Sequence, residues 1–262
     1  MIKKSYRKPY RIKKKKSIIR NRFFWFGLLI LIIIISFFYF LFFSNTFQTK
    51  EVIITGEREI SKHDIYESIQ EKLENKISFL KTKSIFLINT NELEKDILNN
   101  FPKIDKVKIK KRFPESLNIT IVERTSSASW CKEEICFLLD NKGIIFEQAQ
   151  DSSDLIKIID MRNNREFSLS DKVIEPNLLS QIIEINSKLK KDIKIAKVYI
   201  QPNKELNIKT IDDWEIYLNL NEDIDWQLTK LNLVLEKQIP FEKRDELDYI
   251  DLRFTKVYFK YK

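Results

Sequence analysis

The sequence predicts an α+β protein. It has a single N-terminal transmembrane helix, a unit with the order β-α-α-β-β, and then a mainly antiparallel β domain with two helices. Three observations support this: a long uncharged segment, two helical patterns set among alternating strand patterns, and a following region of short apolar runs separated by turns. The predicted boundaries are 1–22 for a basic tail, 23–43 for the span, 44–49 for a spacer, 50–125 for the first domain and 126–262 for the β domain.

The uncharged segment 23–43 is long enough to cross a membrane. Its 21 residues contain no charged side chain. At ~1.5 Å of rise per residue they form a helix of roughly 31 Å, about one hydrocarbon thickness. A cleaved signal peptide would have an apolar run of about 7–15 residues followed by small residues at a cleavage site. This run is longer and ends in FFSNTFQTK, so we expect an uncleaved anchor.

The excess positive charge lies in the N-terminal tail. Of 47 Lys and Arg residues, 11 lie in residues 1–22, which hold none of the 38 Asp and Glu residues. Basic residues beside a span resist translocation, so we expect the tail in the cytoplasm and residues 44–262 outside. The outer part is nearly neutral, and Tyr6 and Tyr10 give the tail little aromatic surface, so we expect no nucleic-acid partner.

The first outer domain has clear local patterns. A strand over 50–56 is followed by a helix that begins at a Ser61–Asp64 capping-box pattern. A short apolar run, SIFLIN, precedes a second helix that is stopped by asparagines and a proline. Residues 103–113 and 116–124 alternate apolar and polar side chains, and Pro-Glu-Ser joins them as a hairpin turn. The two strands predict a sheet with one apolar face, which the helices can cover.

The β domain is predicted from short apolar runs. The expected strands are SASWC, CFLLD, GIIFE, DLIKIID, a meander of AKVYIQ, ELNIKT and WEIYLNL, and the closing strands YIDLRF and KVYFKYK. One helix begins near Pro176, a residue suited to a first helical turn, and an amphipathic helix follows in DWQLTKLNLVLEKQ.

The sequence offers little for catalysis. The one histidine, His63, lies near a predicted helix start and cannot be assembled into a Ser-His-Asp or Cys-His set. The chain has only 3 glycines and no phosphate-binding glycine motif. The pairs Glu133–Glu134 and Asp212–Asp213 fall in predicted turns, and Glu123–Arg124 is expected as an ion pair or edge charge. We therefore expect a protein that is not an enzyme, with no cofactor, no metal site and no small-molecule substrate.

The two cysteines, Cys131 and Cys136, admit three interpretations: a redox or metal site, a structural disulfide, or two free thiols. A thiol oxidoreductase needs C-x-x-C spacing near a helix start, whereas four residues separate these cysteines in a predicted hairpin. Two cysteines and one histidine are too few ligands for a structural zinc site. Outside the cytoplasm disulfides persist, and cross-strand neighbours lie within bonding range. A structural disulfide is the expectation, with free thiols as the alternative.

The ordered motifs resemble a known family. The β-α-α-β-β order behind a single anchor resembles the POTRA domain. The segments FQTKEVIITGEREISKHDI and RFPESLNITIVER, the strand pair FLLDNKGIIF and the strand YIDLR resemble the bacterial division proteins FtsQ/DivIB. Together the motifs cover nearly the whole chain in order, which is more specific than any one of them. A different membrane-anchored POTRA protein of envelope assembly or secretion is the alternative.

The resemblance implies a single-pass inner-membrane protein of the division septum. It would be a scaffold and regulator of septal peptidoglycan synthesis that links early and late division proteins. Its β domain would bind FtsB/FtsL-type coiled-coil proteins, and its POTRA domain other divisome proteins. The implied contact residues on the C-terminal edge are Arg253, Phe254, Val257, Tyr258 and Phe259. Gly56 and Pro114 match family positions, where we expect them to serve turn geometry.

Overall fold

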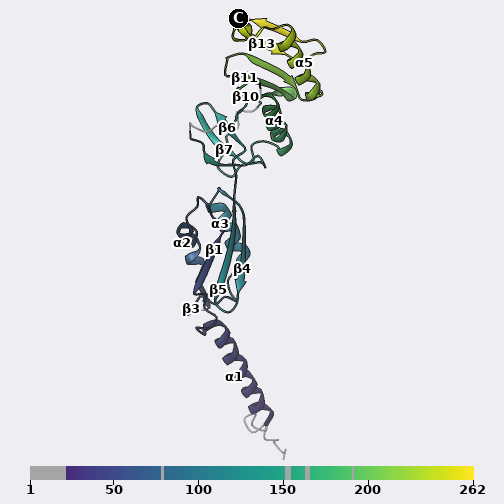
Figure 1. Ribbon diagram of the computed structural model, residues 1–262. Helices are drawn as coiled ribbons and strands as arrows, with labels where there is room; N and C mark the ends of the chain where they lie inside the picture. The colour runs from purple at the N-terminus through teal and green to yellow at the C-terminus, as the bar shows by residue number, and fades with distance from the viewer. Residues whose placement is uncertain (1–21, 78–79, 151–154, 163–165, 191) are drawn as a thin grey trace, which may run out of the picture. The chain divides into compact units, whose positions relative to one another are not determined.

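The computed structural model describes residues 22–77, 80–150, 155–162, 166–190 and 192–262 (Figure 1). The predicted basic tail lies outside these residues, apart from Arg22. Contacts divide the chain into two units. One contains α1, β2, β3 and the turn between β4 and β5, and the other contains most of the remaining sheet residues and helices.

Helix α1, Arg22–Phe43, is the membrane-span candidate. It has a mean hydropathy of 2.9 over its most apolar window, and none of its side chains is buried. A helix this apolar and this exposed is unfavourable in water, because each large apolar side chain forgoes roughly 1.5–3 kcal/mol of burial. These properties are those of a membrane anchor.

The order β-α-α-β-β is confirmed in the first domain after α1 (Figure 1). Strands β1 (Glu51–Thr55), β5 (Ser116–Glu123) and β4 (Ile104–Arg112) form a sheet in the order β1-β5-β4, and the helices are α2 (Lys62–Leu73) and α3 (Thr90–Asn100). Along β4, Val107 and Ile109 are buried while Lys108 and Lys110 are exposed. The alternation in the sequence therefore sets the two faces of this sheet.

The segment between α2 and α3 contains structure that the local sequence patterns do not predict. The apolar run SIFLIN forms a turn, with Ile85 and Ile88 buried and Ser84 making an isolated bridge to Gln48. Just before it, the hairpin of β2 (Asn75–Ile77) and β3 (Leu80–Thr82) was not expected. The hairpin strands are too short to show a clear alternation, and the apolar run buries its isoleucines without needing strand pairing.

The second domain is built on a sheet of nine strands in the order β14-β13-β12-β11-β10-β9-β6-β7-β8. The predicted meander is confirmed, because β10, β11 and β12 pair antiparallel in sequence order. The pairs β6–β9, β9–β10 and β12–β13 are parallel. The strands are β6 (Ala128–Lys132), β7 (Ile135–Leu139), β8 (Ile145–Gln148), β9 (Lys157–Asp160), β10 (Ile195–Gln201), β11 (Glu205–Thr210), β12 (Glu215–Asn219), β13 (Leu247–Asp251) and β14 (Tyr258–Tyr261).

The two predicted helices are the connections that parallel pairing requires. Helix α4 (Pro176–Leu189) links β9 to β10, and α5 (Ile224–Lys237) links β12 to β13. Asp223 caps α5, since its carboxylate accepts a hydrogen bond from the Trp226 backbone N–H at 3.0 Å. Both helices bury their apolar faces in one core with the sheet. This core holds the C-terminal strands β13 and β14 in place.

Candidate partner-binding edge

Strand β14 forms one end of the nine-stranded sheet. It pairs antiparallel with β13, and no further strand lies on its other side among the described residues. In such a pair every second residue directs its backbone N–H and C=O away from its partner. Edge groups of this kind can pair with an added strand. The edge is therefore a ready template for another chain.

The side chains of this edge alternate between core and solvent. Phe259 and Tyr261 are partly buried and pack against the core, whereas Tyr258 and Lys260 are exposed. Val257, which directly precedes β14, also packs against the core. Of the implied contact residues, Val257 and Phe259 thus pack the strand against the core, whereas the Tyr258 side chain is exposed to solvent.

Phe254 lies in the loop between β13 and β14 and is 55% exposed, almost the same as Tyr258 at 54%. Their rings meet edge to face, with centroids 5.9 Å apart. Lys230 of α5 holds the loop in place, because its Nζ donates hydrogen bonds to the carbonyl oxygens of Phe254 at 2.7 Å and Leu252 at 3.1 Å. The two aromatic rings are therefore exposed but held.

Arg253 is engaged within the chain. Its guanidinium makes a two-pronged contact with the Asp251 carboxylate, at 2.9 and 2.7 Å, and Nη1 donates to Glu205 at 2.7 Å. These hydrogen bonds, with Asp251 first, raise the pKa of Arg253. The guanidinium also lies over the Tyr217 ring, 5.1 Å from its centroid. Arg253 thus ties the loop to β11, β12 and β13, so we assign it a positioning role.

Sequence reasoning missed two residues beside this edge. Tyr217 of β12 and Tyr249 of β13 stack with centroids 5.3 Å apart, and both are half-buried. Burial, together with the carboxylate of Glu215, raises the pKa of Tyr217 to about 12, so its hydroxyl stays protonated. Tyr217 alternates with buried neighbours in its strand, which is the signal that could have identified this face, whereas Tyr249 follows half-buried Asp248 and shows no such alternation.

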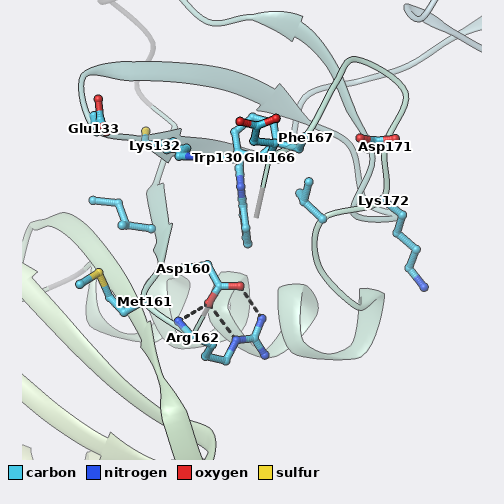
Figure 2. A pocket seen from close by; sticks show the side chains of 13 residues that line it. Trp130, Lys132, Glu133, Asp160, Met161, Arg162, Glu166, Phe167, Asp171 and Lys172 are labelled. Atoms are coloured by element: carbon cyan, nitrogen blue, oxygen red, sulfur yellow. Dashed lines mark hydrogen bonds and ion pairs between the residues drawn. The ribbon is translucent and has the colours of Figure 1, made fainter. Parts of the chain in front are cut away.

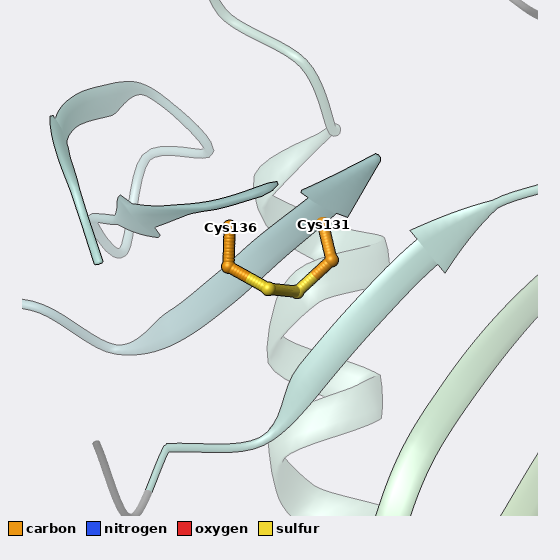
Figure 3. Close-up of a disulfide and its surroundings, with 2 residues drawn as sticks. All are labelled: Cys131 and Cys136. Carbon is orange, nitrogen blue, oxygen red and sulfur yellow. A yellow bond between two sulfur atoms is a disulfide. The ribbon is translucent and has the colours of Figure 1, made fainter. Parts of the chain in front are cut away.

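A disulfide joins Cys131 of β6 to Cys136 of β7 (Figure 3). The two residues are direct partners in the antiparallel register, with Cα atoms 4.0 Å apart. The bond links the two strands close to their tight turn at Glu133 and Glu134. It closes a very short loop, so its stabilisation by chain entropy is small, roughly 2 kcal/mol.

A pocket of about 570 Å³ lies beside this hairpin (Figure 2). Figure 2 shows Asp160 and Arg162 bonded to one another on its wall. Their Oδ2 and Nη2 atoms are 2.8 Å apart. Trp130 contributes an indole ring that is 5% exposed. The pocket is also lined by charged residues of both signs: Lys132, Glu133, Glu166, Asp171 and Lys172. No cluster of three His, Cys, Asp or Glu side chains suited to a metal ion occurs among the described residues.

The two predicted turn positions lie in the first domain. Gly56 follows β1 with φ of +94°, and a Cβ there would meet the Ile121 carbonyl oxygen at 2.1 Å. Only glycine fits such a position without strain. Pro114 lies in the turn between β4 and β5, after a cis peptide bond from Phe113. His63 is exposed and lies 3.3 Å from Glu67.

Glu123 and Arg124, expected as an ion pair or edge charge, each have separate partners. The Glu123 carboxylate accepts backbone hydrogen bonds from Arg58, Glu59 and Ile60 at 2.7 to 3.2 Å. The Arg124 guanidinium lies between Asp105 and Asp140. Both residues therefore fasten the end of β5.

Comparison with known proteins agrees with this architecture. The family model described as "POTRA domain, FtsQ-type" matches residues 47–124, and that described as "Cell division protein FtsQ/DivIB, C-terminal" matches residues 128–253. Similar curated proteins include cell division protein DivIB of Clostridium tetani, 24% identical over 199 residues, covering 73% of this chain and 71% of that protein.

Two further relatives have the same level of identity. DivIB of Clostridium acetobutylicum is 24% identical over 222 residues, covering 79% of this chain and 80% of the relative. Cell division protein FtsQ of Aliivibrio fischeri is 24% identical over 204 residues, covering 78% and 72%. The two matched models follow one another along most of the sequence. The chain therefore belongs to the FtsQ/DivIB family of cell division proteins.

Proposed function

We propose that this protein is a scaffold and regulator of the division machinery, without catalytic activity of its own. It links early and late division proteins and controls septal peptidoglycan synthesis by binding FtsB/FtsL-type coiled-coil partners. Membership of a cell division family supports the general role. The single observation that supports the mode of binding is the open edge of β14 beside two exposed aromatic rings.

The proposed topology is single-pass, with the N-terminus in the cytoplasm and the C-terminus outside, at the division septum. The eleven basic residues before the span favour this orientation. The POTRA domain would then contact other divisome proteins from the outer side.

Partner binding at β14 combines two kinds of contact. The partner's extended segment adds a strand, so that main-chain hydrogen bonds supply affinity and alternate side chains supply specificity. Phe254 and Tyr258 supply apolar anchors of the kind that dominate interface energies. Both rings are already held in place, so little conformational freedom is lost on binding.

The test compares two double variants of the full chain in detergent, titrated with an FtsB-type partner. Phe254→Glu with Tyr258→Glu should weaken binding at least about 30-fold, since losing two anchors costs ~2 kcal/mol or more. Trp226→Glu with Phe241→Glu, at positions 58% and 76% exposed, is the matched control and should bind normally. Amide exchange in β14 should slow when the partner is bound. Unchanged affinity of the first variant would refute this binding mode.

A further inference from the structure

The outer end of α1 is joined to the first domain by side-chain hydrogen bonds. The last carbonyl groups of a helix have no partner within the helix. Here Ser84 Oγ donates to the Leu41 carbonyl at 3.1 Å, and Gln48 Nε2 donates to the Phe42 carbonyl at 2.9 Å. Thr82 Oγ1 also donates to the Phe42 carbonyl. The segment 44–49, predicted as a spacer, is therefore tied by hydrogen bonds to both α1 and the first domain.

A row of aromatic rings continues from the helix onto this domain. Phe40 lies in α1, and its ring centroid is 5.7 Å from that of Phe47. Phe47 lies 5.2 Å from Phe86, and Phe86 lies 5.4 Å from Phe113. Phe86 is 40% and Phe113 58% exposed. Single exposed apolar residues are ordinary, whereas a contiguous group that extends a membrane helix indicates a binding surface.

Basic side chains flank the same rings. Lys111 Nζ donates to the Phe86 carbonyl at 3.3 Å, and exposed Arg112 directly precedes Phe113. Long basic side chains lay their stems along apolar surface and keep the charge in the polar layer. Aromatic and basic residues together are typical of the boundary between a bilayer and water.

The length of α1 places these residues at that boundary. Its 22 residues, at ~1.5 Å each, span about 33 Å, against a hydrocarbon core of about 30 Å. The two lengths agree to within about 3 Å, so the C-terminal end of α1 lies where the hydrocarbon core meets the headgroup layer, which adds roughly 5–7 Å on each side. Groups bonded to the Leu41 and Phe42 carbonyls lie at the same depth.

We infer that Phe47, Phe86 and Phe113, with Lys111 and Arg112, form a second membrane-binding element, which we call the interfacial patch. It inserts its rings among the phospholipid headgroups of the leaflet at the C-terminal end of α1, and its cations contact the lipid phosphates. The patch and α1 together hold the base of the first domain against the bilayer. This inference needs α1 to span the membrane and does not depend on the division role.

The test measures depth in the full chain, reconstituted alone into vesicles of phosphatidylethanolamine and phosphatidylglycerol. A nitroxide label is attached to Phe113→Cys or, separately, to Phe86→Cys. Reference labels at Asn45→Cys, just after α1, and Phe241→Cys, in the 76% exposed position, mark the interface and bulk water. The native cysteines are joined in a disulfide, so they do not take the label.

The measured quantity is the ratio of collision with oxygen to collision with a water-soluble nickel chelate. We expect this ratio at Phe113 and Phe86 to match Asn45 and to exceed Phe241 severalfold. The second label site covers the case in which one variant fails to fold. Ratios at both patch sites equal to that of Phe241 would show that the rings lie in water and would overturn the inference.

Discussion

Replacing Arg124 tests how much the buried ion pair with Asp140 contributes to the stability of the fold. The Arg124 Nη1 lies 2.5 Å from Asp140 Oδ2 and 3.3 Å from Asp105 Oδ1, and the Arg124 Nε donates to the Pro102 carbonyl at 3.0 Å. The Arg124 side chain is 10% exposed and that of Asp140 is 4% exposed. Replacing Arg124 with Leu removes the guanidinium and leaves the Asp140 carboxylate buried without its main counter-charge.

The expected cost follows from this burial. Breaking a buried ion pair by removing one partner typically costs about 3–5 kcal/mol. Asp140 Oδ1 still accepts backbone hydrogen bonds from Lys142 and Ile144 at 2.9 Å each, which moderates the penalty. We therefore expect Arg124→Leu to lower the free energy of unfolding by about 3 kcal/mol. Adding Asp140→Asn should recover part of this loss, because the buried charge is then removed as well.

Denaturant titration of the full chain in detergent, followed by tryptophan fluorescence, measures both effects. The matched control is Arg162→Leu, which breaks a pair with Asp160 in which the Arg162 side chain is 36% and the Asp160 side chain 12% exposed, so the arginine is in contact with water. Exposed pairs contribute only about 0–1 kcal/mol. If Arg124→Leu costs no more than Arg162→Leu, the reasoning from burial is wrong.

Three further predictions concern single features. Burial opposes ionisation of Glu123, but three backbone N–H donors outweigh this effect and lower the pKa of Glu123 below the ordinary 4.5. The ionised carboxylate therefore stabilises the fold fully above pH 4.5, and this stabilisation is lost as the pH falls through the lowered pKa. Acid titration of unfolding should show Glu123→Gln costing less at pH 3 than at pH 7, and an equal cost at both would contradict this. Gly56→Ala should cost at least about 2 kcal/mol of unfolding free energy through strain and the close Ile121 carbonyl, while Gly27→Ala, with open space around it, should be neutral. Alkylation of the denatured protein without reductant should leave Cys131 and Cys136 unmodified by mass, and modification of both would reject the disulfide.

The regular strands were predictable because the alternation of polar and apolar residues along the chain is enough to indicate a strand with one buried face. Alternating lysines and apolar residues in 104–112 give one buried and one solvated face whatever the neighbouring strand is. The helices were predictable for the same reason, because their start signals, a capping residue or a proline, lie within the first turn. Parallel pairing between β12 and β13 was not predictable in the same way, because it depends on how α5 returns the chain to the sheet.

The candidate edge was only partly predictable. The exposure of Tyr258 follows from alternation, and so does the inward position of Phe259. The engagement of Arg253 with Glu205, 48 residues away, depends on the strand order, which no local pattern encodes. The same holds for Arg124, whose partners lie 16 and 19 residues distant. Long-range ion pairs are set by the assembled sheet and had to be observed.

The central claim, a role in the division septum, is tested most directly by where the protein lies in dividing cells. A fluorescent protein fused to the N-terminus should give a band at the division site. The double variant Phe254→Glu with Tyr258→Glu should still fold and enter the membrane, but should fail to retain its FtsB-type partner at that band. A uniform signal around the envelope of dividing cells for the unaltered protein would contradict the account.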